Sequence, residues 1–458
     1  MVIEDFDEAI RLGPNDSIAY ICRGDVHQLS GNYDLAIADY NRAIRLSPNY
    51  ADAYNNRGRV YHNMRNYDLA IADFNQAIRL DPNCADAHYF RGVEYLAKGS
   101  HDLAIADFNR AVGLAPNYAE AYNFRGIAHL AKGSHDLAIA DFNRAIGLSP
   151  NYAIAYSCRG VTYRNNGDYD LAIADFDRAI GLAPNYADAY NNRGIAHYNM
   201  GNLDLAVADY DRAIRLNPKY VDAYYGRGVA HCGMRNYDLA IADFNQAVRL
   251  NPKYASAYSC RGIAHSNMGN RDLAIADYNQ AIRLNPNYAN AYYCRGVAHL
   301  DRGNYDLAIA DFNRTIRLDP NYAAAYNRRG DAHLAKGSYD LAIADFDWAI
   351  RLNPEYAVAF NGRGIAHLAK GNHDLAIADC TQTIRLDPNY AKAYSGRGLA
   401  HYAKGDFDLA IADYEAALRI DSNHAKARTG IELARRQKGR HGSRKHAVGG
   451  GEEGDSGY

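Results

Sequence analysis

Residues 51–84 read ADAYNNRGRVYHNMRNYDLAIADFNQAIRLDPNC, and this stretch decides the fold. Tyr54 and Gly58 lie at the i, i+4 spacing that places residues on one face of a helix. After a short polar break, Ala70 and Phe74 begin the apolar face of a second helix. We therefore expect two helices joined by a tight turn.

Proline recurs along the whole chain at one period. The chain has twelve prolines, and successive prolines lie 34 residues apart: Pro14, Pro48, Pro82, Pro116, Pro150, Pro184, Pro218, Pro252, Pro286, Pro320, Pro354 and Pro388. A proline ends a helix because it lacks an N–H and disfavours helix in the residue before it. Such a period is typical of a solenoid of stacked helix pairs. The sequence therefore predicts an all-α solenoid, not the roughly three globular domains that its length would suggest.

Residues suited to helix N-caps precede the second helix of every unit. They are Asn32, Asn66, Ser100, Ser134, Asp168, Asn202, Asn236, Asn270, Asn304, Ser338, Asn372 and Asp406. We expect their side chains to accept hydrogen bonds from unpaired backbone N–H groups. A glycine precedes ten of these twelve caps, and Arg65 and Arg235 precede the other two.

Every unit also repeats a glycine, an arginine and an aspartate, as in Gly58, Arg57 and Asp73. A glycine inside a helix costs ~1 kcal/mol relative to alanine, so we expect the second helix to approach closely there, with Ala70 and Ala77 opposite. A buried arginine usually needs a carboxylate partner. The pattern predicts a ladder of Arg–Asp pairs along the stack, and the alternative is an arginine that extends into solvent.

Histidine fills one repeated position in nine units and tyrosine fills it in three; the histidines are His27, His129, His197, His231, His265, His299, His333, His367 and His401. Equivalent positions lie two helices apart, whereas zinc ligands must lie much closer together. We therefore expect packed rings and no metal site. The seven cysteines are odd in number and form no CxxC, which disfavours a disulfide framework. No catalytic residue and no cofactor site is expected, because the sequence has no nucleophile with a matching base and no phosphate-binding glycine loop.

Charge and hydropathy argue against several classes of protein. Lys plus Arg number 51 and Asp plus Glu number 53, which gives a formal charge of −2. This balance argues against a dedicated nucleic-acid-binding protein, because such proteins usually have an excess of basic residues. No apolar run is long enough to cross a membrane, and the start MVIEDFDEAI lacks the basic and apolar pattern of a signal peptide. We expect a cytoplasmic protein with no membrane partner.

The repeated unit resembles the tetratricopeptide repeat, with matches at Tyr54, Gly58, Tyr61, Ala70, Phe74, Ala77 and Pro82. Arg57 departs from the leucine that is usual in that family. The resemblance implies an α-solenoid, a right-handed superhelix of antiparallel helix pairs. We expect a half repeat (second helix only) at residues 1–16, twelve repeats at 17–424, a capping helix at 425–440 and a disordered tail at 441–458.

In arrays of this family, one face of each first helix lines the concave side and binds partner peptides. The repeats of this chain differ most on that face. Aromatic anchors beside amide groups suit an extended or helical peptide. The candidate partner-binding residues are Asn55, Asn56, Tyr89, Phe90, Asn123, Phe124, Asn191, Asn192, Tyr225, Tyr293, Asn327, Arg328 and Asn361.

An acidic edge borders this face in the N-terminal half of the chain, formed by Asp52, Asp86, Glu120, Asp188 and Asp222. The same repeat position holds a lysine, Lys392, towards the C-terminal end. The sequence therefore predicts a ligand whose basic portion binds towards the N-terminal half.

Two specialised binding modes of the family match poorly. Chaperone adaptors hold a C-terminal carboxylate in a clamp of lysine, asparagine and arginine. Asn56, Asn192 and Arg328 match single clamp positions, but the clamp lysine of the first repeat is missing. A groove ladder of asparagines, as in glycosyltransferase-linked members, is matched at its principal position only by Asn56 and Asn192. We expect no chaperone carboxylate ligand.

The sequence thus predicts a non-enzymatic scaffold or adaptor that binds a protein or peptide in its groove. One alternative is a recruiting or regulatory arm of an enzyme that acts in trans. A second is a nucleic-acid-binding solenoid, favoured only by the basic stretch of residues 435–440. A third is a recently expanded array without a settled partner.

Overall fold

The computed structural model describes residues 2–448, and these residues form helices joined by short turns. The first helices of the repeats are α2 (Ser17–Leu29), α4 (Ala51–Asn63), α6 (Ala85–Ala97), α8 (Ala119–Ala131), α10 (Ala153–Asn166), α12 (Ala187–Asn199), α14 (Val221–Gly233), α16 (Ala255–Asn267), α18 (Ala289–Asp301), α20 (Ala323–Ala335), α22 (Ala357–Ala369) and α24 (Ala391–Lys404). The second helices are α3 (Tyr33–Leu46), α5 (Tyr67–Leu80), α7 (His101–Leu114), α9 (His135–Leu148), α11 (Tyr169–Leu182), α13 (Leu203–Leu216), α15 (Tyr237–Leu250), α17 (Arg271–Leu284), α19 (Tyr305–Leu318), α21 (Tyr339–Leu352), α23 (His373–Leu386) and α25 (Phe407–Ile420). The helix α1 (Val2–Leu12) precedes the pairs and α26 (Ala425–Val448) follows them. The all-α fold predicted from the 34-residue period is confirmed.

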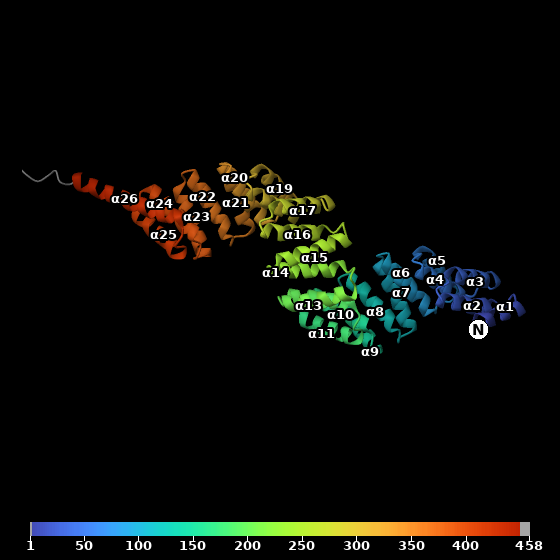
Figure 1. Cartoon of the computed structure of the whole chain (residues 1–458). Helices are drawn as coiled ribbons and strands as arrows, with labels where there is room; N and C mark the ends of the chain where they lie inside the picture. The colour runs from blue at the N-terminus through green and yellow to red at the C-terminus, as the bar shows by residue number, and fades with distance from the viewer. Residues whose placement is uncertain (1, 449–458) are drawn as a thin grey trace, which may run out of the picture. The chain divides into compact units, whose positions relative to one another are not determined.

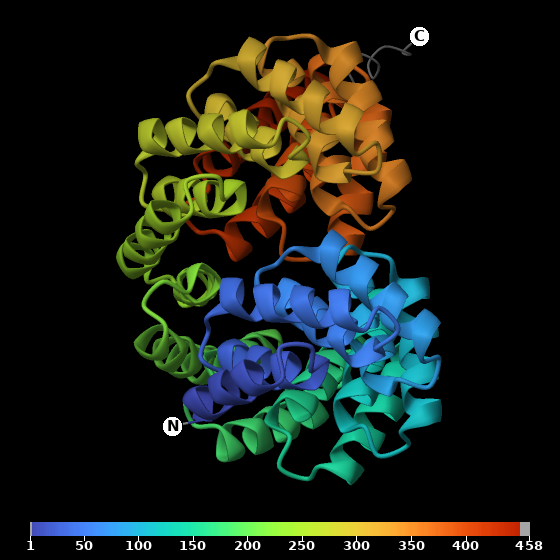
Figure 2. The same cartoon turned by 90° about the vertical axis from the view of Figure 1, so that its right-hand side faces the viewer.

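The chain forms two compact units, Met1–Met234 and Arg235–Tyr458. Within each unit, every helix packs against the next one along the chain, so the helices are stacked in sequence order (Figure 1, Figure 2). Each repeat therefore buries its apolar faces only against its neighbours, which is the arrangement of a solenoid.

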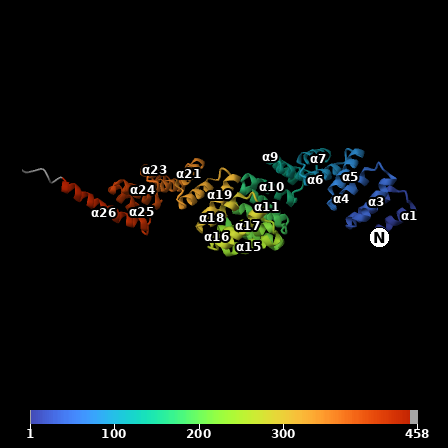
Figure 3. The same ribbon diagram turned by 90° about the horizontal axis from the view of Figure 1, so that it is seen from above.

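The first helices of neighbouring repeats also touch one another within each unit, as α4 touches α6 and α22 touches α24. No two second helices make such a contact among the residues that the structure describes. The first helices therefore lie on the inner side of each unit, and we call them the inner row and the second helices the outer row. The helix α26 continues the inner row, because it contacts α24 as well as α25 (Figure 3).

The turn inside each repeat needs a left-handed residue before the second helix. The ten expected glycines adopt positive φ, for example 76° at Gly31 and 89° at Gly167. Arg65 and Arg235 take the same conformation, with φ of 57° and 61°, although they carry side chains. The turn geometry is therefore set by the packing of the repeat, and glycine is the residue that adopts it without strain.

The prediction of side-chain N-caps is wrong for the second helices, although their first residues are placed correctly. At Asn32, and at the other eleven cap positions, the side chain makes no capping hydrogen bond. The ψ angle at Asn32 is 65°, outside the extended region from which a cap side chain usually binds the helix N–H groups. Asp16, with an extended ψ of 101°, does accept a hydrogen bond from the N–H of Ile18.

The residue before the proline makes the side-chain contact that the cap does not. The Asp81 carboxylate accepts a hydrogen bond from the Asn83 N–H at 3.0 Å. Seven further repeats share this turn, through Asn217, Asn251, Asn285, Asp319, Asn353, Asp387 and Asp421, the last of which precedes a serine in place of the proline. Aspartate or asparagine two residues before the bound N–H is a known turn signal, and it was present in the sequence.

The recurring glycine of the inner row faces an aromatic ring and not the alanines expected opposite it. A Cβ atom added to Gly58 would lie 2.7 Å from Cε1 of Phe74, which is closer than real Cβ contacts. Phe74 is fully buried, as are Ala70 and Ala77 beside it. Glycine is therefore required because the ring of the second helix packs directly onto the backbone of the first.

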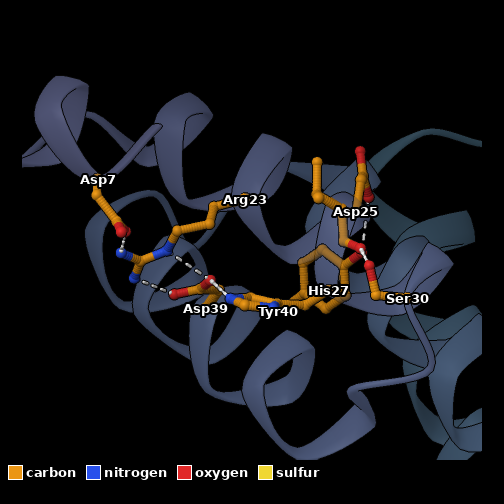
Figure 4. Close-up of polar contacts among 8 residues, drawn as sticks. Asp7, Arg23, Asp25, His27, Ser30, Asp39 and Tyr40 are labelled. Carbon is orange, nitrogen blue, oxygen red and sulfur yellow. Dashed lines mark hydrogen bonds and ion pairs between the residues drawn. The ribbon is translucent and has the colours of Figure 1, made fainter. Parts of the chain in front are cut away.

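The predicted Arg–Asp ladder is confirmed, and it connects three helices at each step. Arg91 of α6 donates from Nε and Nη2 to the two carboxylate oxygens of Asp107 in α7, at 2.8 Å and 2.6 Å. Its Nη1 donates to Asn75 Oδ1 of the preceding outer helix, α5, at 2.7 Å. The same arrangement, in which the acceptor on the preceding outer helix is an Asn, Asp or Thr oxygen, recurs at Arg23, Arg57, Arg125, Arg159, Arg193, Arg261, Arg295, Arg329, Arg363 and Arg397. Figure 4 shows the first step, in which Arg23 lies between Asp39 and Asp7.

The aspartates of the ladder are buried, and Asp209, for example, pairs with Arg193 at 2.6 Å. Hydrogen bonds to Asp209 raise the pKa of Arg193, even though burial of the guanidinium acts in the opposite direction. A planar guanidinium that binds a carboxylate with two parallel hydrogen bonds is a strong and directional pair. The ladder therefore sets the spacing of the helices as well as contributing to stability.

The C-terminal helix differs from the expected boundary. We expected a capping helix that ends at residue 440, and α26 continues to Val448. Its packed part is short, because Ala427, Ile431 and Ala434 are its buried residues among those up to 440. Residues 449–458, the remainder of the predicted disordered tail, lie outside the described residues.

Replacing Arg193 by leucine should destabilise the first unit strongly. The variant leaves the Asp209 carboxylate buried without its cation, which costs ~3–5 kcal/mol when one partner of a buried pair is removed. Urea unfolding followed by circular dichroism would measure the loss. The double variant Arg193→Leu/Asp209→Leu should recover part of it, because it buries no unpaired charge. An unchanged unfolding midpoint for the single variant would mean that the arginine acts as a solvated surface residue.

A pair of glycine substitutions tests the ring packing. Gly126→Ala places a Cβ 2.7 Å from Cε1 of Phe142 and should destabilise the chain by ~1–3 kcal/mol through overpacking. Gly147→Ala, in α9, meets no atom within 4 Å and should stabilise the chain by up to ~1 kcal/mol. Thermal unfolding of both variants measures the difference, and equal effects would contradict the proposed role of the ring.

Candidate functional site

One column of the predicted partner-binding residues lies beneath the surface. The structure buries six of these side chains: Asn55, Tyr89, Asn123, Asn191, Asn327 and Asn361. Tyr225 and Tyr293, in the same column, are half-buried. The prediction that these residues contact a partner directly is wrong for the six, because neighbouring helices cover their side chains. They can influence binding only through the side chains that pack on them.

The next column is partly accessible. Asn56, Phe90, Phe124 and Asn192 are half-buried, and Arg328 is exposed. Phe90 stacks on Phe74 with ring centroids 5.9 Å apart, and the Arg59 guanidinium lies 5.2 Å from the Phe90 centroid.

The buried Tyr89 joins these rings into one cluster across α6 and α8. Its ring centroid lies 5.0 Å from that of Phe90 and 5.7 Å from that of Phe124. It also lies 4.8 Å from the centroid of Tyr118, at the end of the same repeat. The rings of α6 and α8 therefore form one packed aromatic cluster on the inner row of the first unit.

The acidic edge is accessible throughout its length. Asp52, Asp86, Glu120, Asp188 and Asp222 are all exposed. The first four form no ion pair with any described lysine, arginine or histidine. This separates them from acids of the outer row such as Asp68, which pairs with Lys98 at 2.6 Å.

A column of tyrosines runs beside the acidic edge, and the sequence analysis did not single it out. Burial and then the charge of Asp86 raise the pKa of Tyr118. Burial and then the charge of Glu120 raise the pKa of Tyr152 to about 12. These phenols therefore keep their protons and can donate hydrogen bonds near the acids. The signal was the tyrosine two residues after the proline in ten of the repeats, which follows Pro-Asn, Pro-Lys or, at Tyr356, Pro-Glu.

The first three inner helices also carry a polar network that the sequence analysis missed. The Asp25 carboxylate accepts hydrogen bonds from the Tyr40 hydroxyl at 2.6 Å (Figure 4) and from Asn56 Nδ2 at 2.9 Å. The fully buried Glu94 lies 2.5 Å from Nδ1 of His62. Most other repeats have alanine at the position of Glu94, so the departure from the repeat pattern was the available signal.

The histidine column is packed between the helices of each repeat. Nε2 of His129 lies 4.0 Å from the Asp141 carboxylate, which is also bound by Arg125. Burial lowers the pKa of His129, His265, His299, His333 and His367 below the ordinary value of 6.5. The rings are therefore neutral near pH 7.

Within residues 2–448, no three histidine, cysteine or acidic side chains are grouped so that they could hold a metal ion. Burial raises the pKa of the thiols of Cys158, Cys294 and Cys380 to about 12, so these thiols stay protonated at neutral pH. A protonated thiol is a weak nucleophile. Among the described helices, none has the length and apolar character needed to cross a membrane.

Comparison with protein families gives matches along most of the chain. A family model described as TPR repeat matches residues 24–64 and 162–201. Two models described as Tetratricopeptide repeat match residues 55–119, 104–153, 261–323 and 327–391, and residues 187–220, 221–254 and 391–424. A search of curated proteins finds no match to the sequence.

Several solved structures contain similar chains. A chain of the APC/C hetero-tetramer Cut9-Hcn1 is 17% identical, with a TM-score of 0.49, and the match covers 94% of this chain and 92% of that one. Yeast Tom70 is 18% identical, with a TM-score of 0.40, over 93% of this chain and 96% of its own. A MamA protein is 30% identical over 38% of this chain and 94% of its own, with a TM-score of 0.34.

The lowered pKa of the histidines predicts a loss of stability in mild acid. As the pH falls through 6.5, the unfolded chain binds protons that the folded chain does not, so the free energy of unfolding should decrease. Urea unfolding at pH 7.5 and pH 5.5 measures this, with both values taken about one unit from 6.5. The matched control replaces His265, His299, His333 and His367 by tyrosine, which three repeats already contain. If this variant loses stability between the two pH values as much as the natural chain does, the histidines are not the cause.

Proposed function

Since the chain belongs to the tetratricopeptide-repeat family, whose repeats generally act as non-catalytic protein-interaction modules, we propose that its first unit binds basic protein segments on the inner row. The bound segment would lie across α4, α6 and α8. The chain itself would act as a scaffold or adaptor and perform no chemistry.

The exposed and uncompensated acids of the inner row carry this proposal. Asp52, Asp86 and Glu120 lie on three consecutive inner helices and form no ion pair within the described chain. Exposed charges arranged along one face attract partners of opposite charge and select against partners of the same charge. A lysine- or arginine-containing segment is the ligand that this arrangement favours.

The half-buried rings beside the acids supply apolar contact for the same segment. Phe90 and Phe124 belong to a packed ring cluster, so they lose little conformational entropy when a ligand covers them. Aromatic side chains in such positions commonly contribute much of the binding energy of an interface. Tyr118 and Tyr152 add hydrogen-bond donors next to the acids.

Two alternatives are less well supported. A recruiting arm for an enzyme in trans would use the same surface and differs only in the partner. A nucleic-acid-binding function would rest on the basic stretch of α26, but Arg435 pairs with Glu415 at 3.0 Å and Lys438 pairs with Asp408. Part of that positive charge is therefore neutralised by the protein. A cytoplasmic location is proposed because all seven cysteines are free thiols.

Charge reversal of the acidic edge should weaken binding of the natural partner. The partner is first captured from a native lysate with the intact chain and identified by mass spectrometry. The variant Asp52→Lys/Asp86→Lys/Glu120→Lys should then bind it about tenfold more weakly and with a flatter dependence on salt, as measured by calorimetry at two ionic strengths.

The matched control reverses three exposed acids of the outer row that also lack ion pairs, in the variant Asp34→Lys/Asp136→Lys/Asp170→Lys. These residues lie in first turns of second helices, so the control should lose some stability and keep its affinity. Equal affinities and equal salt dependence in the two variants would contradict the proposed site.

A further inference from the structure

The last three helices of the inner row expose aliphatic side chains that earlier repeats cover. Ile365 of α22, Leu399 of α24 and Leu433 of α26 are 39%, 50% and 44% exposed. At the equivalent position of α16 and α18, Ile263 and Val297 are half-buried. We call Ile365, Leu399 and Leu433, with the exposed Val358 of α22, the C-terminal apolar patch.

In each of the three helices a glycine lies one turn before the exposed residue. Gly362, Gly396 and Gly430 lie three residues before Ile365, Leu399 and Leu433, on the same helical face. Earlier repeats have Cys260, Cys294 or Arg328 at this position, and α14 has Gly226, whose neighbour Val229 is half-buried.

The glycines are fixed by the outer row. A Cβ on Gly362 would lie 2.6 Å from the ring of Phe346, and one on Gly430 would lie 2.5 Å from the ring of Tyr414. These contacts leave no room for a side chain beside the apolar residues. Because glycine has no side chain, a partner backbone can approach the helix backbone closely at these positions of the patch.

The three helices that carry the patch are neighbours. The helix α24 contacts both α22 and α26 directly. Leu368 and Tyr402, half-buried and one turn further along α22 and α24, extend the same apolar face. Contiguous exposed apolar surface of this kind marks an interaction site more often than scattered single residues do.

Cations border the patch, and none of them is compensated within the described chain. Lys392 and Lys426 occupy the repeat position that the acidic edge occupies in the first unit, and both are exposed. Arg436 is exposed on the same side of α26. None of the three forms an ion pair with a described side chain, whereas nearby Lys404 pairs with Asp374 at 2.5 Å. The inner face of α22 and α24 has no acid at its variable positions.

From this combination, we propose that the C-terminal apolar patch binds an acidic, amphipathic protein segment. Its apolar side chains would pack over Ile365, Leu399 and Leu433, and its carboxylates would pair with Lys392 and Lys426. The proposal shares with the proposed function only the premise that the inner row binds protein segments. The surface lies in the other unit, and its ligand has the opposite charge.

Selection of peptides from a random phage-displayed library on the full chain tests the proposal without a known partner. Peptides retained by the natural chain and lost on Leu399→Asp/Leu433→Asp should combine net negative charge with apolar residues at helical spacing. A synthetic peptide of this class should bind Lys392→Glu/Lys426→Glu about tenfold more weakly. Replacing its acids by lysine should restore binding to that variant.

Two controls separate this site from other effects. Leu375→Asp/Leu409→Asp changes equally exposed leucines of the outer row, and it should leave peptide binding unchanged. The variant Asp52→Lys/Asp86→Lys/Glu120→Lys should also keep these peptides, so the two proposals can fail separately.

Three results would overturn the inference. In the first, the selected peptides show no acidic bias, or none of them distinguishes the patch variant from the natural chain. Another is equal loss of binding in the outer-row control. The third is self-association in sedimentation experiments that only the patch variant abolishes, because it would make a second copy of the chain the occupant.

Discussion

The three-helix hydrogen-bond pattern of each inner-row arginine is the constraint on which the rest of the structure depends. Arg91 holds Asp107 of its own repeat with two parallel bonds and Asn75 of the preceding repeat with a third. A guanidinium is planar and rigid, so these bonds fix both the distance and the angle between helices. Because the aspartate is buried, a helix pair that moved away would leave a charge without a partner, which is far more costly than losing a surface pair.

This regular spacing brings the inner-row helices into contact and decides which of their residues reach solvent. Glycine permits the closest approach within a repeat, since the ring of Phe74 packs onto the backbone at Gly58. Contact between neighbouring inner helices then buries Asn123 and Asn327 completely. The binding surfaces are therefore formed by the variable residues that remain accessible, and the buried ones act as their support.

The inner and outer rows differ in how many of their exposed charges form ion pairs. On the outer row, Asp102 pairs with Lys132 of the next repeat, and similar pairs recur along both units. On the inner row, Asp52, Asp86 and Glu120 of the first unit, and Lys392 and Lys426 of the second, form no ion pair with a described side chain. The unpaired charges of the inner row are therefore available to a partner of opposite charge, in each unit.

The sequence by itself determined the helix pairs, their period and the Arg–Asp ladder. The period follows from the recurrence of proline, and the helix pairs and the ladder follow from residues within one 34-residue unit, such as Arg57 and Asp73, whose spacing places them on facing helices. The sequence also predicted the N-cap positions of the second helices correctly. It did not predict that their side chains make no capping hydrogen bond, because that depends on the ψ angle that the turn imposes at the cap, 75° at Asn66. Only the tertiary structure decided that Asn123 is buried and Leu399 exposed, although both occupy the variable face of a first helix. Burial at these positions depends on contacts with neighbouring helices, as when Tyr89 of α6 packs against Phe108 of α7 and Phe124 of α8. No pattern within a single helix encodes that packing.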